Sequence, residues 1–164
     1  MKKIFIIIVL FSFAIAGCEK DDICPEEAPT TPQVVIQFFD NASTASKAVT
    51  ELKILEYGTT NVLGVFNEAL IKLPLKTNAD VVKYSLILNS DKPLFINTDY
   101  LEFNYSTNTV YISRACGYKS LFELINNSPI LTDNIVPVDY WIKNITVVTN
   151  KILDENETHI KIYF

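Results

Sequence analysis

Apolar and polar residues alternate along most of the chain after residue 33, with a period of two. Three segments show this alternation most clearly: Val34, Ile36 and Phe38; Val82, Tyr84, Leu86 and Leu88; and Ile160, Ile162 and Phe164. The intervening positions are polar or mixed, and the apolar ones are rich in β-branched and aromatic side chains. Such a pattern is typical of short strands that bury one face.

Strands are expected at 33–40, 49–57, 62–66, 69–73, 82–88, 100–105, 109–114, 140–149 and 158–164, with a short extended piece at 94–97. Ser106–Asn108 is expected to close a hairpin, and Pro74 to lie at a strand end or sheet edge. Tyr118–Asn126 is the one segment whose apolar positions fit a helix. Residues 127–139 are expected to form a loop.

Short strands separated by turn residues predict one antiparallel β-sandwich, immunoglobulin-like or related, with one short helix. A small β-barrel is the alternative. The expected organisation is a leader at 1–17, an acidic and proline-rich tether at 18–32, and a single β-rich domain at 33–164.

The leader itself begins with Lys2 and Lys3, followed by 13 uncharged residues, Ile4–Ala16. That run is too short to span a bilayer core, which needs about 20 apolar residues, and it suits a secretory signal. It ends in Ile15-Ala16-Gly17-Cys18, which resembles the bacterial lipobox. The resemblance implies that Cys18 is acylated and becomes the N-terminus of the mature protein. An ordinary signal peptide is the alternative.

The residues after Cys18 are Glu19-Lys20-Asp21-Asp22. A lysine followed by two acids is similar to the surface-export signal of Bacteroidota lipoproteins, which assigns Lys20, Asp21 and Asp22 that role. The resemblance implies a protein anchored in the outer membrane and facing the cell exterior. A solvated acidic linker on a protein that faces the periplasm is the alternative.

The net charge of the chain argues against some classes of partner. Without the two leader lysines, the chain carries 12 Lys and Arg against 19 Asp and Glu, a net charge of −7. Phosphate contacts need clustered cations, so nucleic acid is not an expected partner. The same balance disfavours a second, electrostatic contact with a membrane.

Cys24 and Cys116 remain once Cys18 is assigned to lipid. A pair of cysteines in an oxidising compartment predicts a disulfide, with a free thiol or a metal pair as the alternatives. Zinc fits poorly because the chain has one histidine, His159, and no CxxC motif. Cys24 lies six positions after Cys18, and an extended chain spans at most ~3.5 Å per residue. The disulfide would therefore hold the Cys116 turn within roughly 20 Å of the membrane surface.

No catalytic, metal or cofactor site is expected. A hydrolytic triad needs a base beside its nucleophile, and the alternation places His159 on a solvent or sheet face. The four glycines do not form a phosphate-binding loop. Tyr100, Tyr105, Tyr111 and Tyr163 alternate with apolar residues, which makes them candidates for an aromatic face that binds a glycan or a peptide. Ordinary cross-strand packing is the competing interpretation.

Five segments resemble a family of short Bacteroidota lipoproteins known as domain of unknown function number 6452: CEKDDIC at 18–24, VVIQFFD at 34–40, SRACGYK at 113–119, WIKNITVVTN at 141–150 and ETHIKIYF at 157–164. The resemblance implies an outer-membrane lipoprotein with a β-rich fold and implies no activity. We therefore expect a non-catalytic envelope module that binds or scaffolds a protein or glycan partner. A carbohydrate- or peptide-binding module is the alternative.

Overall fold

The computed structural model describes residues 23–133 and 139–164. By the density of their contacts these residues form two compact units. We call residues 23–30 and 110–119 the disulfide tip, and the described residues of 31–109 and 120–164 the sandwich. Strands β6 and β7 contribute residues to both units.

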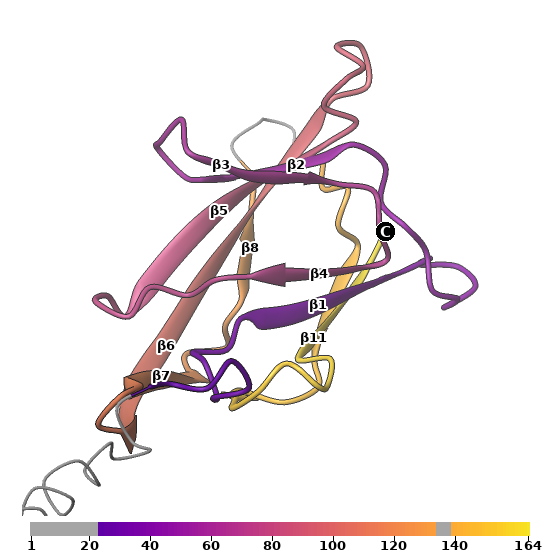
Figure 1. The fold of residues 1–164 in the computed structure, drawn as a ribbon. Helices are drawn as coiled ribbons and strands as arrows, with labels where there is room; N and C mark the ends of the chain where they lie inside the picture. Colours follow the sequence, from indigo (N-terminus) through magenta and orange to yellow (C-terminus); the bar gives the residue numbers. More distant parts are fainter. Residues whose placement is uncertain (1–22, 134–138) are drawn as a thin grey trace, which may run out of the picture. The chain divides into compact units, whose positions relative to one another are not determined.

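Two sheets make up the fold (Figure 1). The smaller sheet has the order β4 (Leu70–Leu73), β1 (Val34–Phe39), β11 (Ile160–Tyr163) and β9 (Asn144–Val147). The larger sheet has the order β10 (Lys151–Ile152), β7 (Gly117–Leu124), β6 (Asn97–Ser113), β5 (Val81–Leu88), β2 (Leu52–Glu56) and β3 (Val62–Phe66), with β8 (Ile130–Thr132) also paired to β6. The arrangement is the predicted sandwich and not a closed barrel.

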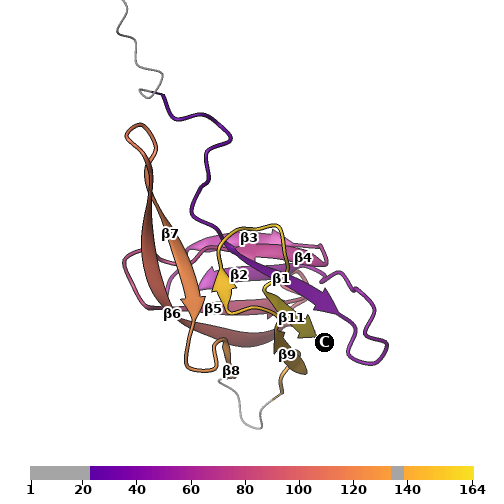
Figure 2. The ribbon, with the colours of Figure 1, turned by 90° about the horizontal axis from the view of Figure 1, so that it is seen from below.

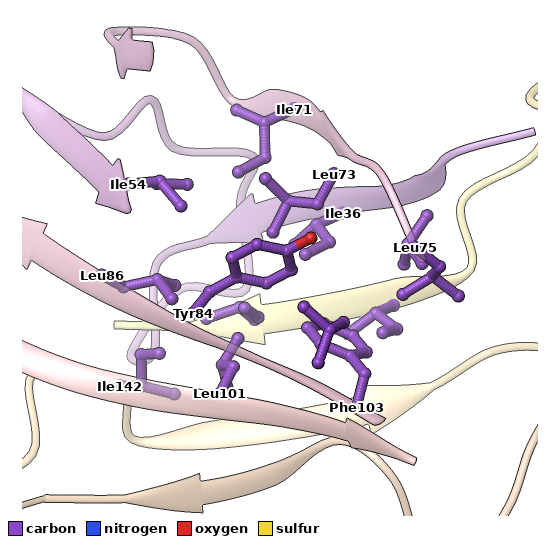
Figure 3. Close-up of a cluster of buried hydrophobic side chains, with 14 of the residues drawn as sticks. Ile36, Ile54, Ile71, Leu73, Leu75, Tyr84, Leu86, Leu101, Phe103 and Ile142 are labelled. Carbon is purple, nitrogen blue, oxygen red and sulfur yellow. The ribbon is translucent and has the colours of Figure 1, made fainter. Parts of the chain in front are cut away.

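The core lies between the two sheets and follows from the alternation in the sequence. Ile36 and Phe38 from the smaller sheet are fully buried, as are Leu86, Leu101 and Phe103 from the larger one. Figure 3 shows the labelled side chains of the two sheets pointing toward one another. Removing a buried Phe side chain from such a core costs about 3–5 kcal/mol.

One strand pair departs from the antiparallel prediction. β1 and β11 are parallel, with Ile36 opposite Ile160 and Phe38 opposite Ile162. Parallel neighbours need a long connection between them. Here the connection is nearly the whole sandwich, because β1 and β11 are its first and last strands.

The predicted hairpin at Ser106–Asn108 is wrong. Those residues lie inside β6, which continues without a break from Asn97 to Ser113. Ser106–Asn108 contains no glycine, and a threonine suits an extended strand. The chain turns instead at residues 114–116, before Gly117, whose φ of +69° is readily adopted by glycine.

The predicted helix at Tyr118–Asn126 is also wrong. Its residues form most of β7, in which Ser120, Phe122 and Leu124 are buried at every second position. Over so short a segment the apolar residues fit both the helical period of about 3.6 and the strand period of two. The segment forms a strand because β6 and β10 pair with it on either side. Within residues 23–133 and 139–164 the fold contains no helix.

The expectation at Pro74 is confirmed. β4 is an edge strand of the smaller sheet, and it ends at Leu73, directly before the proline. The expected short strand at 94–97 is wrong, because β6 begins only at Asn97 and residues 93–95 form a turn.

Candidate functional site

His159, the only imidazole in the chain, is buried in the smaller sheet with 1% of its surface exposed. Its Nδ1 accepts a hydrogen bond of 2.8 Å from the backbone N–H of Val35. Burial lowers the pKa of His159, although the nearby charges of Glu157 and Asp154 oppose the change. The neutral side chain therefore accepts a hydrogen bond from the backbone of β1. Of the two predicted positions, a solvent face or a sheet face, the burial excludes the solvent face.

Asp99 is the buried carboxylic acid among the described residues, and sequence reasoning missed it. Its Oδ2 accepts a 2.8 Å hydrogen bond from the N–H of Ile142, and the adjacent Trp141 donates from Nε1 to the carbonyl of Leu86 at 3.2 Å. Burial raises the pKa of Asp99 to about 6. The sequence does carry a signal for this burial, because Asp99 lies two and four positions before the inward residues Leu101 and Phe103 of the same strand.

Three of the four predicted tyrosines, Tyr100, Tyr105 and Tyr163, lie in the sandwich and do not form one exposed face. Tyr105 is fully buried: its ring packs edge-to-face on Phe122, and its hydroxyl donates to the carbonyl of Lys76 and accepts from the same residue's N–H, each at 3.0 Å. Its place on a ligand-binding face is therefore wrong. The inward phase of β6 and the fixed Lys76 backbone explain the burial.

Tyr100 and Tyr163 lie half-buried in separate aromatic pairs. Tyr100 packs edge-to-face on Tyr57 at 5.4 Å between ring centroids, with the Lys83 ammonium 4.7 Å from the Tyr57 centroid. Tyr163 stacks on Phe39, and a lysine, Lys161, lies over the Phe39 ring at 5.4 Å. In each pair a lysine covers one ring face, as expected of cross-strand packing.

The two most exposed large apolar residues in the described part of the sandwich are adjacent, and a third follows them directly. Leu94, Phe95 and Ile96 are 92%, 68% and 45% exposed, and they lie in the connection between β5 and β6. We call residues 89–96 the apolar loop. Single exposed apolar residues are common on proteins, but three in sequence on one loop form a patch.

The apolar loop has a defined conformation. The N–H of Phe95 donates to the carbonyl of Lys92 at 2.8 Å, and the Asn89 side-chain amide donates to the Phe95 carbonyl at 3.3 Å. Asn89 has a φ of +53°, a left-handed conformation that asparagine tolerates better than most residues. The N–H of Asn89 also donates to the carbonyl of Thr50 before β2, so the start of the loop is fixed to the sheet.

The disulfide tip carries a further exposed apolar group. Cys24 and Cys116 form the predicted disulfide, with their Cα atoms 4.8 Å apart. Tyr111 and Tyr118, on the two arms of the hairpin, are 53% and 69% exposed and pack edge-to-face at 5.3 Å. Ile23, next to Cys24, is 81% exposed.

Described residues of the sandwich border shallow hollows at two places. One, of about 240 Å³, is bordered by Glu123 and Lys151, which lie opposite one another in β7 and β10. The other, of about 400 Å³, is bordered by the turn at Asn126 and Asn127. Across the described parts of the chain, no group of three His, Cys, Asp or Glu residues is arranged to hold a metal ion.

A family model matches residues 51–164, well over half of the chain. Its description is a family of unknown function, DUF6452. The chain belongs to this family. No curated protein and no solved structure matches the chain.

The DUF6452 match includes the apolar loop, Asp99, His159 and the hairpin part of the disulfide tip. It begins after Cys24 and β1, so the opening of the chain lies outside it. The predicted lipidation site Cys18 and the predicted export residues Lys20, Asp21 and Asp22 lie outside the residues that the structure describes. Among the residues that it does describe, none form a helix with the length and apolar character needed to cross a membrane.

Proposed function

We propose that this protein is a lipid-anchored, non-catalytic binding module of the bacterial outer membrane, displayed on the cell exterior, which holds a partner protein through its apolar loop. The observation that carries the proposal is the exposure of Leu94, Phe95 and Ile96 on a hydrogen-bonded loop. Fully burying such a side chain contributes about 1.5–3 kcal/mol of binding free energy. A partner that covers this loop would therefore be held mainly by burial of these side chains.

A protein pocket suits the apolar loop better than an anionic lipid surface does. Loops that bind anionic membranes combine apolar residues with several cations. The apolar loop has one cation, Lys92, beside one acid, Asp91, and the chain after its leader has a net charge of −7. Binding should therefore depend on the fit of the three apolar side chains and should change little with salt.

The buried imidazole and the buried carboxyl group support a non-catalytic role. His159 is occupied by the Val35 N–H, and Asp99 by the Ile142 N–H. Each is at most 1% exposed, so neither side chain is open to a substrate in solution. Both instead hold the backbone of neighbouring segments.

Lipid anchoring and export are supported by the leader. The uncharged run Ile4–Ala16, the small residues before Cys18 and the Lys20-Asp21-Asp22 signal are all consistent with it. The Cys24–Cys116 disulfide agrees with an oxidising compartment outside the cytoplasm. The alternative, a glycan or peptide platform, has less support because Tyr105 is buried and Tyr100 and Tyr163 are packed in separate pairs.

The test is cross-linking in intact cells, followed by purification of the full-length protein and identification of its adducts. We expect one reproducible protein adduct, lost in the double variant Leu94→Ser, Phe95→Ser. The matched control is Val65→Ser, which alters an exposed apolar residue on the edge strand β3. An adduct that persists in the loop variant and disappears in the control would exclude the apolar loop as the binding surface.

Anchoring is tested separately. Cells fed a labelled fatty acid should label the wild-type chain, and Cys18→Ser should lose the label. Protease added to intact cells should remove the protein from the surface. Complete protection from protease would contradict display on the exterior and would favour the periplasmic face.

A further inference from the structure

We infer that the disulfide tip is itself a membrane contact: Tyr111, Tyr118 and Ile23 enter the interfacial layer of the bilayer in which Cys18 is anchored. This inference rests on the proposed lipid anchor. It assigns the exposed apolar side chains of the disulfide tip to a lipid surface rather than to a protein.

The first observation is the distance available to the tip. Cys24 is covalently bonded to Cys116, at the turn between β6 and β7. Six residues lead from Cys18 to Cys24, which at ~3.5 Å per residue reach at most about 20 Å. An acylated Cys18 therefore keeps the turn of this hairpin close to the headgroups, whatever conformation the intervening residues take.

The second observation is the chemistry that this position exposes. Tyr111, Tyr118 and Ile23 all belong to the disulfide tip, and each is more than half exposed. Figure 2 shows the chain after residue 22, in indigo, beside the turn between β6 and β7. Tyrosine is enriched at membrane interfaces because its ring enters the apolar region while its hydroxyl stays hydrated.

The third observation is the local charge. Arg114 and Lys119 on the hairpin are matched by Glu26 and Glu27 on the N-terminal segment of the same unit. The tip thus has no net attraction to anionic headgroups. Contact through the two rings and Ile23 should consequently occur on neutral lipid as well, and it should resist salt.

The contact is tested with the full-length lipidated protein carrying Tyr118→Trp, reconstituted in phosphatidylcholine vesicles whose acyl chains are brominated. Bromine quenches tryptophan fluorescence only over short distances. We expect the emission of the introduced tryptophan to be lost in brominated vesicles and retained in unbrominated ones. The native Trp141 is 6% exposed and gives an internal reference that should keep its emission.

Two further variants keep the test decisive. Tyr111→Trp, on the other arm of the hairpin, should be quenched like Tyr118→Trp. Tyr57→Trp is the matched control, since Tyr57 is a tyrosine with 46% exposure that lies in the sandwich. It should keep its emission. Quenching at residue 57 equal to that at residue 118 would overturn the inference.

Flotation of the same vesicles separates this inference from the proposed function. Wild-type protein that floats with vesicles, while Cys18→Ser does not, establishes the anchor. Flotation without quenching at residues 111 and 118 would overturn the tip contact and leave the anchor standing. Failure of the wild-type protein to float would contradict both the anchor and the contact.

Discussion

The disulfide tip and the apolar loop both expose apolar side chains, but they are held in place by different means. At the tip, a covalent bond joins Cys24 to Cys116 across a sequence separation of 92 residues. In the apolar loop, Asn89 and a few backbone hydrogen bonds fix the turn to the larger sheet. Exposed apolar side chains do not stabilise the conformation of their own segment, because they are not removed from water until a partner binds. Other bonds must therefore hold each segment, and the two regions use different ones.

The largest expected effect comes from breaking the disulfide. Because the bond closes a long loop, the chain-entropy model predicts that Cys24→Ser with Cys116→Ser lowers the free energy of unfolding by up to about 4 kcal/mol. Urea unfolding monitored by Trp141 fluorescence measures it. Hydrogen exchange should accelerate at the Cys116 amide and stay slow at Phe95, whose hydrogen bond to Lys92 is independent of the disulfide. Equal acceleration at both amides would remove the distinction between the two regions.

Asp99 is expected to make the loop-bearing sandwich sensitive to pH. Burial raises its pKa from 3.8 to about 6, so between these values the folded state holds a proton that the unfolded state has lost. Stability from this group is therefore greatest at low pH, falls as the pH rises from 3.8 through the folded-state pKa of about 6, and levels off above it. Asp99→Asn keeps an acceptor for the Ile142 N–H, and it should raise stability at pH 7 by about 1–3 kcal/mol.

Thermal unfolding at several pH values measures this effect. The neighbouring charges of Asp133 and Lys143 act on the same carboxyl group in opposite directions. His159 has the opposite pH dependence, because its lowered pKa makes the folded state resist protonation as the pH falls below its ordinary value. His159→Asn separates the two contributions. Identical pH profiles for the wild type and Asp99→Asn would contradict the assignment.

A smaller effect is expected at Asn89, which supports the apolar loop. Asn89→Ala places an alanine at a φ of +53° and removes the hydrogen bond to the Phe95 carbonyl, which should cost about 1–2 kcal/mol. Asn89→Gly tolerates the same φ and loses only the hydrogen bond. Denaturant unfolding of both variants measures the difference. If alanine and glycine were equally tolerated, the backbone conformation at Asn89 would not be what shapes the loop.

Substitutions in the apolar loop are expected to have the smallest effect on stability and the largest effect on binding. Leu94→Ser with Phe95→Ser alters two exposed side chains and should change the free energy of unfolding by no more than about 0.5 kcal/mol per site. The cross-linked adduct should nonetheless disappear. A large loss of stability would mean that these side chains pack on the sandwich, and the loop would then be structural.

The sandwich itself could be predicted because most of its inward residues lie at every second position. The alternation predicts one face for Val34, Ile36 and Phe38, and all three are buried in β1. The errors lie where a short pattern fits two structures. Tyr118–Asn126 satisfies both a helical and a strand period, and the neighbouring strands β6 and β10 favour the strand.

The candidate sites were harder to predict because exposure is decided by packing that the local pattern does not contain. Leu94, Phe95 and Ile96 resemble a short strand in sequence, yet no neighbouring strand pairs with them in the described structure and they remain exposed. Tyr105 has the same kind of sequence neighbours as Tyr100, but it is in phase with the buried residues Leu101 and Phe103 of β6 and is therefore buried. Asp99 could have been found from that same phase. The disulfide could be inferred from the number of cysteines and the expected compartment, and its position at a hairpin turn came only with the structure.

The central claim is that the apolar loop and the disulfide tip contact different partners in a protein that we propose to be lipid-anchored. A photo-activatable cross-linking residue placed at position 95 or position 118, in intact cells, tests it most directly. The account predicts a protein adduct from position 95 and a phospholipid adduct from position 118. Phospholipid adducts from position 95, or protein adducts alone from position 118, would contradict it.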